Sequence, residues 1–119
     1  MKLPEEGVLL RIFIGEADTY KGRPLYEQIV LKTRELNLAG ATVVRGIMGF
    51  GANSRLYTAK ILRLSEDLPV VIEVVDTKEN IDKLLPLLDE VVKEGLITME
   101  RVTVIKYTHS ASGREQPVR

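Results

Sequence analysis

Cysteine is absent from this 119-residue chain, and histidine occurs once, at His109. Without cysteine there are no disulfides, thiolate zinc sites, iron–sulfur clusters or cysteine nucleophiles. One histidine in a polar C-terminal stretch, where we expect it to be solvated, argues against a histidine-rich metal site and against a Ser-His-Asp triad. The sequence therefore carries little of the side-chain chemistry used by metal centres and nucleophilic enzymes.

Net charge and long apolar runs are also missing. Lys plus Arg and Asp plus Glu both number 17, which gives a formal net charge of zero and argues against a nucleic-acid binder with a basic face. No apolar run approaches the roughly 18 residues of a membrane-spanning helix, and the first residues lack an apolar signal segment. We expect a cytoplasmic protein with no nucleic-acid partner and no membrane insertion.

Hydrophobic residues make up 45% of the chain, but aromatic residues only 5% and tryptophan none. A chain of this size forms one domain with a core of its own, and that core must be aliphatic. After Tyr107 the sequence becomes polar, with Ser, Gly and Pro. We therefore expect one folded domain over residues 1–107 and a flexible tail over residues 108–119.

Hydrophobic periodicity predicts the order β-α-β-β-α-β. Period-two or β-branched runs predict strands over residues 8–14, 41–48, 68–75 and 96–107, and apolar stripes at helical spacing predict helices over about 23–36 and 76–95. This order is the ferredoxin-like pattern of an α+β protein. We expect a four-stranded antiparallel sheet with the first and third strands in the centre and both helices on one face. The stretch 56–64 is ambiguous, and we favour a strand there.

Local signals predict where the helices begin and end. Pro24 suits the first turn of the first helix, and Gly40 is expected to end it or its trailing turn. Asp76 resembles an N-cap, with Glu79 completing a capping box. An internal Pro86 predicts a kink in the second helix, which we expect to end at Gly95.

The sheet face without helices is predicted to be unusually apolar for a monomer. Each of three strands offers apolar residues around one charge: Leu9, Arg11 and Phe13; Val43, Arg45 and Ile47; Val71, Glu73 and Val75. Such a patch is typical of an interface, so we expect a homo-oligomer whose sheets face inward, with Arg11 and Arg45 paired with Glu73 across neighbouring subunits. The alternative is a partly wet sheet with single exposed apolar residues.

Polar residues gather in two loops. The connection from Gly49 to Pro69 is long, and it holds Asn53, Ser54, Arg55, Tyr57, Lys60 and Arg63. Its cations suit a phosphate or an acidic partner, although a solvated arm explains them equally well. For Glu16 and Asp18, after the first strand, a polar loop is a better explanation than a metal or general-base site, because no third ligand converges there.

Several motifs resemble the PII signal-transduction proteins. The stretch 40–51 ends in Gly49-Phe50-Gly51, as a PII strand does before its long T-loop, and residues 68–76 match a PII strand and its Asp cap. The whole of residues 10–107 resembles an uncharacterised bacterial and archaeal family of PII-like proteins, through motifs such as Ile14-Gly15-Glu16, Gly22-Arg23-Pro24-Leu25-Tyr26, Arg45-Gly46-Ile47, Ser54-Arg55 and residues 62–69.

This resemblance implies a homotrimer with nucleotide clefts between subunits and a protruding arm that senses ligand and contacts a target protein. It implies a ligand site at Gly49, Gly51, Asn53, Ser54, Arg55 and Arg101, and a partner-binding arm at Tyr57, Lys60 and Arg63. The C-terminal Arg114 and Arg119 would lie near the phosphates. The chain departs from the PII pattern at Ala52, which replaces a basic residue. It departs again at Thr98-Met99-Glu100, which replaces a glycine-rich phosphate turn.

The sequence leads to one principal hypothesis and two alternatives. The principal one is a non-enzymatic, oligomeric PII-like regulator that binds an adenine nucleotide between subunits and a partner protein through the arm. The first alternative is a small enzyme on a phosphorylated or anionic metabolite, such as a phosphatase or isomerase. It would use Arg45 or Arg55 as anion clamp and Glu16 or Asp18 as base. The second alternative is a purely structural oligomer.

Overall fold

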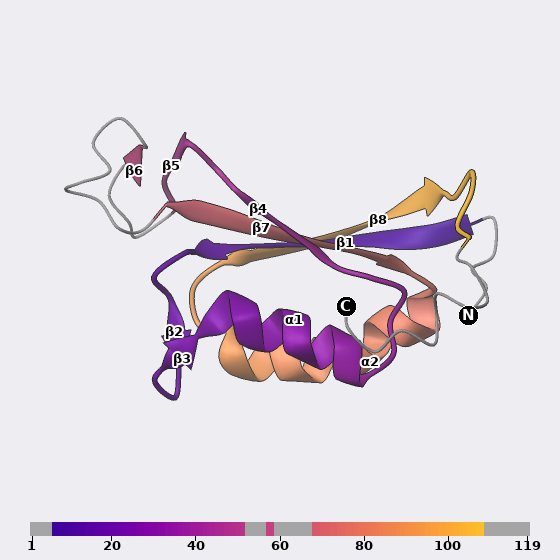
Figure 1. The fold of residues 1–119 in the computed structure, drawn as a ribbon, viewed down its shortest axis with the longest axis horizontal. Helices are drawn as coiled ribbons and strands as arrows, with labels where there is room; N and C mark the ends of the chain where they lie inside the picture. The colour runs from indigo at the N-terminus through magenta and orange to yellow at the C-terminus, as the bar shows by residue number, and fades with distance from the viewer. Residues whose placement is uncertain (1–5, 52–56, 59–67, 109–119) are drawn as a thin grey trace.

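The protein is a two-layer α+β domain, seen in a computed structural model that describes residues 6–51, 57–58 and 68–108. One antiparallel sheet has the order β4-β7-β1-β8, with β1 (Glu6–Gly15) and β7 (Pro69–Asp76) central and β4 (Thr42–Arg45) and β8 (Leu96–Thr103) at the edges. Helices α1 (Leu25–Glu35) and α2 (Lys78–Val91) cover one face of this sheet (Figure 1). The predicted ferredoxin-like architecture and central strands are confirmed.

The core lies between the helices and one face of the two central strands. Alternate residues of β1 and β7 are buried, as period-two patterning predicts, while Leu9, Arg11 and Phe13 and their β7 neighbours lie on the other face. The buried apolar side chains of the sheet and helices are Val8, Leu10, Ile12, Ile14, Val70, Ile72, Val74, Leu25, Ile29, Ile81, Leu84, Leu88 and Val91.

Asp76 has a different role from the predicted N-cap. It continues the buried alternation of β7 and is completely buried, where its carboxylate accepts hydrogen bonds from the backbone N–H groups of Ala39 and Thr77 and from the side chain of Asn80. The N-cap of α2 is Thr77, whose hydroxyl accepts from the Asn80 N–H. Asp76 thus ties the loop before β4 to the start of α2.

The first helix and its ends also differ from the prediction. Pro24 occupies the N-cap position, so α1 begins at Leu25 and not at Arg23. At the other end, Asn37 adopts a left-handed conformation with φ 63°, and its N–H bonds to the Arg34 carbonyl. Asn37, and not Gly40, therefore reverses the chain after the helix.

A small hairpin occupies what the sequence predicts as a polar loop. Strands β2 (Thr19–Tyr20) and β3 (Arg23–Pro24) pair across Lys21 and Gly22, both with positive φ. Positive φ at both central residues is the mark of a type I′ hairpin turn. Two-residue strands carry no detectable periodicity, which is why hydrophobic patterning misses them.

The predicted facing of the second sheet strand is wrong. Val44 pairs with Val71 and Thr42 with Glu73, so Thr42 and Val44 share the helix-free face, whereas Val43 and Arg45 lie on the helix side. A shift of one residue reverses every side chain in a strand. Here two adjacent valines on a short exposed edge strand leave the phase undetermined in the sequence.

The same strand is shorter than expected. β4 ends at Arg45, because Pro69, the next partner in register, accepts from the Gly46 N–H at 2.6 Å but has no N–H of its own to donate. β5 (Met48–Gly49) then pairs with β6 (Tyr57–Thr58) in a separate ribbon. Ile47 lies between β4 and β5, and therefore off the main sheet. Of the stretch 56–64, for which we favoured a strand, only residues 57–58 are described, and they are extended.

The end of the second helix and the last strand also depart from the prediction. α2 is continuous across Pro86 and ends at Val91, before Gly95. Gly95 instead permits a close approach, since a Cβ there would lie 2.7 Å from the Phe13 carbonyl oxygen. β8 ends at Thr103, four residues before the predicted Tyr107. Among the described residues, no helix has both the length and the apolarity to cross a membrane.

Candidate functional site

The helix-free face of the sheet is organised in rows by strand register. We call the connection from Gly49 to Pro69 the arm. Next to it, an apolar row crosses all four strands through Val44, Val71, Phe13 and Leu96. The next row is polar: Thr42, Glu73, Arg11 and Thr98. Val75, Leu9 and Glu100 form a third. An apolar face crossed by one ionic row is thus present in the folded chain.

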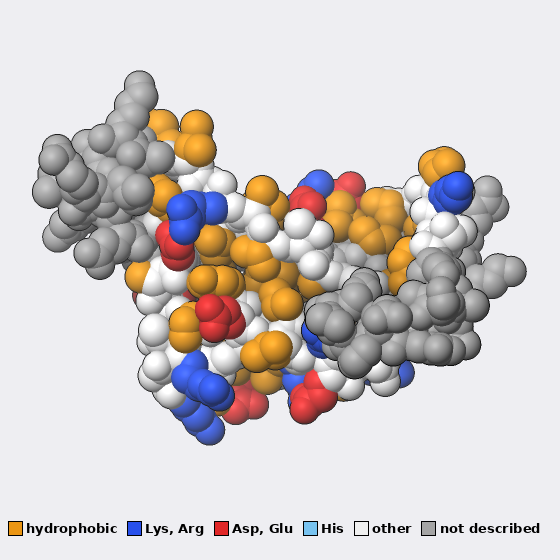
Figure 2. Space-filling view, in the orientation of Figure 1, with side chains coloured by type: hydrophobic (Ala, Val, Ile, Leu, Met, Phe, Trp, Pro, Cys, Tyr) orange, Lys and Arg blue, Asp and Glu red, His pale blue; other side chains and the backbone are white. Residues whose placement is uncertain are grey.

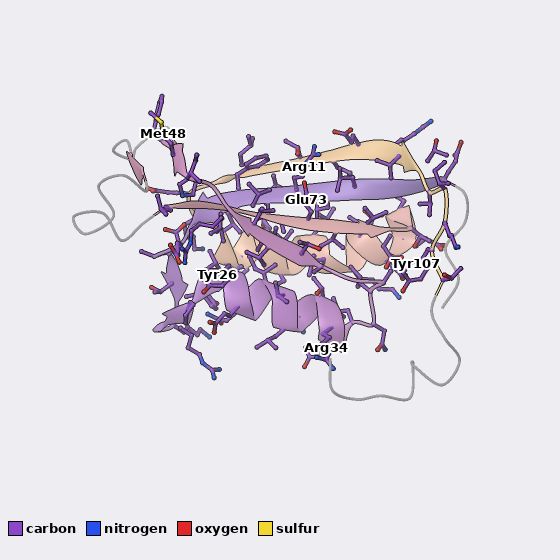
Figure 3. The ribbon with its side chains drawn as sticks, turned by 45° about the horizontal axis from the view of Figure 1, so that its top comes forward. Arg11, Tyr26, Arg34, Met48, Glu73 and Tyr107 are labelled. Carbon is purple, nitrogen blue, oxygen red and sulfur yellow. The ribbon has the colours of Figure 1, made fainter. Side chains whose placement is uncertain are left out.

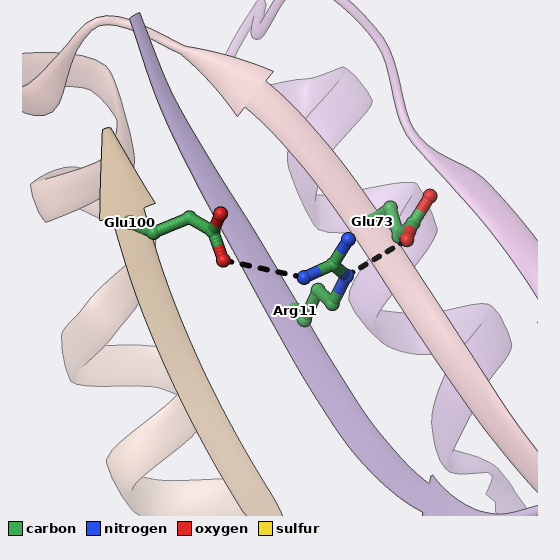
Figure 4. A network of polar contacts seen from close by, with 3 residues as sticks. All are labelled: Arg11, Glu73 and Glu100. Carbon is green, nitrogen blue, oxygen red and sulfur yellow. Dashed lines mark hydrogen bonds and ion pairs between the residues drawn. The ribbon is translucent and has the colours of Figure 1, made fainter. Parts of the chain in front are cut away.

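Arg11 lies between two carboxylates at the centre of this face (Figure 4). Its Nε donates to Glu73 at 2.9 Å, and its Nη1 lies 3.4 Å from Glu100. The hydrogen bond to Glu73 raises the pKa of Arg11 above its ordinary value, so this guanidinium stays charged. An Arg11–Glu73 pair therefore forms within one chain, on adjacent strands.

Arg45 does not pair with Glu73 as predicted. On the helix side of β4 its Nη2 lies 2.6 Å from an oxygen of Glu16, just after β1. The reversed phase of β4 explains the difference, because Arg45 and Glu73 point to opposite faces of the sheet. The enzyme alternative from the sequence names Glu16 and Arg45 as candidates for one site, as base and anion clamp, but it does not predict an ion pair between them.

The base of the arm is packed around Pro69, where β7 begins. A Cβ at Gly46 or Gly49 would lie 2.9 or 3.0 Å from Pro69 Cγ, so both positions need glycine for this close approach. The large side chains of Ile47, Met48 and Phe50 are exposed here. Figure 3 shows Met48 projecting from this end of the molecule, away from the sheet.

Two of the predicted ligand residues, Gly49 and Arg101, lie at opposite ends of the sheet within one chain. Gly49 packs at the end of β1 near Gly15, whose register partner is Pro69, whereas Arg101 pairs with Val8 near the start of β1. Seven residues of extended strand separate these ends by about 23 Å. A single chain therefore does not bring Gly49 and Arg101 to one ligand.

Several predicted site residues cannot be placed. Asn53, Ser54, Arg55, Lys60 and Arg63 lie outside the described residues, as do His109, Arg114 and Arg119. Tyr57 is described by its backbone alone, in β6, and Gly51 follows β5 as an exposed residue. Their roles stay predictions.

Arg101 lines an open hollow of about 500 Å³ at the start of α2, together with Lys78, Glu6 and Glu79 among others. Two cations and two carboxylates share this hollow, so it has no strong preference for charge of one sign. Lys78 is itself paired with Asp82 at 2.9 Å. Among the described residues, no three His, Cys, Asp or Glu side chains converge to hold a metal ion.

The segment after β8 crosses the helix-free face, which sequence analysis missed. Val104 packs over Gly7, where a Cβ would lie 3.2 Å from Val104 Cγ2, and the Tyr107 hydroxyl donates to the Ala39 carbonyl at 3.1 Å. Together with Leu9 and other residues of the face, this segment borders an open hollow of about 690 Å³. Figure 3 places Tyr107 at the end of the sheet opposite Met48.

Asp18 has a structural role, in line with the polar-loop interpretation. Its carboxylate accepts from the Gly15 N–H at 3.0 Å, and its carbonyl accepts from the Leu25 N–H. Both contacts shape the turn from β1 towards α1. In Figure 2, which views the sheet nearly edge-on, hydrophobic side chains gather across the middle of the side that carries β4 and α1.

Comparison with known proteins connects this geometry to a family. Residues 7–104 match the model of the DUF190 family, described as "Uncharacterized ACR, COG1993". A UPF0166 protein of Aquifex aeolicus is 40% identical over 100 residues, which cover 82% of this chain and 91% of the relative. UPF0166 protein MJ1524 of Methanocaldococcus jannaschii is 40% identical over 99 residues, with the same coverage.

Similar solved structures come from a PII-like protein. The chain matches CPII of Thiomonas intermedia K12, a nitrogen regulatory PII-like protein solved with ADP, AMP and bicarbonate, with a TM-score of 0.60 at 16% identity, covering 85% of this chain and 90% of CPII. A structure of CPII with ADP and bicarbonate gives a TM-score of 0.61 at 17% identity and the same coverage. The chain therefore belongs to the DUF190 family, to which the UPF0166 proteins are related in sequence, and it has a PII-like fold.

Proposed function

We propose that this protein is a PII-like regulator that assembles as a homotrimer and binds an adenine nucleotide between subunits without turning it over. The observation that carries the proposal is the helix-free face with its apolar row across all four strands, in a protein of PII-like fold. Its nucleotide specificity is suggested by CPII, which was solved with ADP and AMP. We further propose a cytoplasmic location.

The helix-free face supports assembly through its chemistry. Val44 and Leu96 are exposed at the two ends of the apolar row, where a second chain would cover them. The charge that would be buried with them is already paired, since Arg11 bonds to Glu73 within the chain. A buried guanidinium without a partner would strongly destabilise the assembly. Arg11 keeps its partner Glu73, so burial of this face does not create that situation.

The placement of the ligand residues supports a site shared between chains. Gly49 and Arg101 are too far apart to contact one ligand within a chain, so a site that uses both must combine the arm base of one subunit with the Arg101 end of another. In this proposal the arm residues Tyr57, Lys60 and Arg63 then contact the regulated protein. The exposed Ile47, Met48 and Phe50 offer it an apolar platform at the arm base.

Assembly is tested with a matched pair of exposed leucines. Leu96 is 56% exposed in the apolar row, and Leu31 is 61% exposed on α1. We expect Leu96→Glu to reduce the trimer to lower-mass species in native mass spectrometry, because the new charge would have to be buried, and Leu31→Glu to leave it intact. A wild-type protein that is monomeric at micromolar concentration would refute the assembly.

Ligand binding is tested separately by calorimetric titration of the wild-type protein with ATP, ADP and AMP. Saturable binding of at least one nucleotide, with no release of phosphate over hours, is the expected result. Absence of binding by all three would refute a nucleotide regulator. Steady phosphate release, lost in Arg45→Ala, would favour the enzyme on an anionic metabolite instead.

A further inference from the structure

Glu16 contacts both chain segments that flank the arm. Its carboxylate holds the outgoing strand through Arg45 at 2.6 Å, and its backbone N–H donates to the carbonyl of Leu68, on the returning segment, at 2.8 Å. The two segments also bond to each other through the Gly46 N–H and the Pro69 carbonyl. Glu16 and Arg45 therefore meet where the arm leaves the sheet and returns to it.

This ion pair lies beside the backbone that carries Gly49. Gly46, the neighbour of Arg45, and Gly49 both pack closely on the ring of Pro69. The chain from Arg45 to Gly49 is thus folded into a small space around one proline. An anion bound beside Gly49 would be close to the Arg45 guanidinium, because an arginine head group reaches well beyond its own backbone.

The Glu16–Arg45 pair is geometrically suited to exchange. Arg45 uses one terminal nitrogen towards Glu16, its side chain is 56% exposed, and a guanidinium has five N–H donors in all. Exposed ion pairs stabilise a protein only weakly, while phosphate groups take arginine in a stronger, two-bond geometry. Glu16, with its side chain 24% exposed, is a carboxylate that a phosphate can displace without rearranging the sheet.

We propose that Arg45 is an anion-binding residue of the nucleotide site and that Glu16 occupies it in the ligand-free protein. The phosphate oxygens of the nucleotide displace the Glu16 carboxylate from Arg45, and Glu16 thereby sets the affinity for the anion. This inference rests on the proposed nucleotide binding and adds the residue that binds the phosphate and the internal carboxylate that competes with it. Displacement also breaks the side-chain contact between the loop after β1 and the outgoing end of β4.

The test is calorimetric titration of the full chain with ADP, with adenosine as the probe that lacks phosphate. Glu16→Gln is expected to tighten ADP binding about two- to fivefold, because it removes an exposed ion pair that competes with the ligand. Arg45→Gln is expected to weaken ADP binding about tenfold or more, because charge-assisted hydrogen bonds to phosphate are lost. The double variant should match Arg45→Gln, since the effect of Glu16 acts through Arg45.

Glu35→Gln is the matched control, because it removes the carboxylate of the exposed Lys32–Glu35 pair on α1 and should leave ADP binding unchanged. Adenosine affinity should be the same in all variants. If Glu16→Gln binds ADP with wild-type affinity or more weakly, Glu16 does not compete with the ligand for Arg45. The proposed nucleotide binding would be unaffected by that result. That result decides the matter even if Arg45→Gln does not fold. Failure of both wild type and Glu16→Gln to bind ADP would overturn this inference, and the proposed function falls with it if ATP and AMP also fail to bind.

Discussion

The buried carboxylate of Asp76 offers the sharpest test of how the fold is held together. Its Oδ2 accepts from the Ala39 N–H at 2.7 Å, while its Oδ1 accepts from the Thr77 N–H at 2.7 Å and from Asn80 Nδ2 at 2.9 Å. The residue is completely buried, so water is not available to replace a lost acceptor without local opening.

The Asp76→Asn substitution separates these contacts while preserving the shape of the side chain. One amide oxygen can still accept from Thr77 and Asn80, but the amide nitrogen then faces the Ala39 N–H, which is also a donor. One lost hydrogen bond to a charged acceptor costs about 1.5–3 kcal/mol. We expect the free energy of unfolding to fall by that amount, and by more in Asp76→Ala, which removes all three bonds.

The assay is urea denaturation followed by circular dichroism at one protein concentration, because assembly makes apparent stability concentration-dependent. Asp82→Asn is the control, since it removes an exposed carboxylate paired at i,i+4 and should cost no more than about 0.5 kcal/mol. If Asp76→Asn destabilised the protein by no more than Asp82→Asn, the assigned role of Asp76 would be wrong.

Two further predictions concern a close backbone approach and a tyrosine. Gly95→Ala should lower the free energy of unfolding by about 1–3 kcal/mol, because the new Cβ would lie 2.7 Å from the Phe13 carbonyl. Gly40→Ala, with no atom within 4 Å, should change it by less than about 0.5 kcal/mol in the same urea assay. The hydrogen bond to Glu90 raises the pKa of Tyr20 above its ordinary value of 10.0, so the stability it contributes is complete below pH 10 and is lost as the pH rises through the raised value. Absorbance titration should show one late-ionising phenol that Tyr20→Phe lacks, and a stability difference between the two proteins that did not vary with pH would contradict this.

Long, strongly patterned segments were predictable from the sequence. The strand around Ile12 and the strand around Ile72 alternate buried and outward residues over their whole length, which determined both their structure and their facing. The buried alternation also extends to Asp76, so the sequence held a signal that this residue faces the core. Of the motifs shared with the family, Ile14-Gly15-Glu16 lies at the end of the first of these strands, and residues 68–76 include the second.

Residue pairs distant in sequence were decided by the tertiary structure. Val43 and Val44 are both apolar, so only the pairing of Val44 with Val71 settles which one faces the helices. That choice directs Arg45 away from Glu73, and no local pattern indicates a partner 29 residues earlier in the chain.

The sequence alone therefore determined the α+β architecture, the aliphatic core and the absence of cysteine chemistry, because these depend on composition and on periodicity within a segment. The tertiary structure decided the ion pairs at Arg11 and Arg45, the buried carboxylate of Asp76 and the path of the chain over Gly7. Each of these depends on backbone register between strands, or on chain segments that pack together only when the sheet has formed.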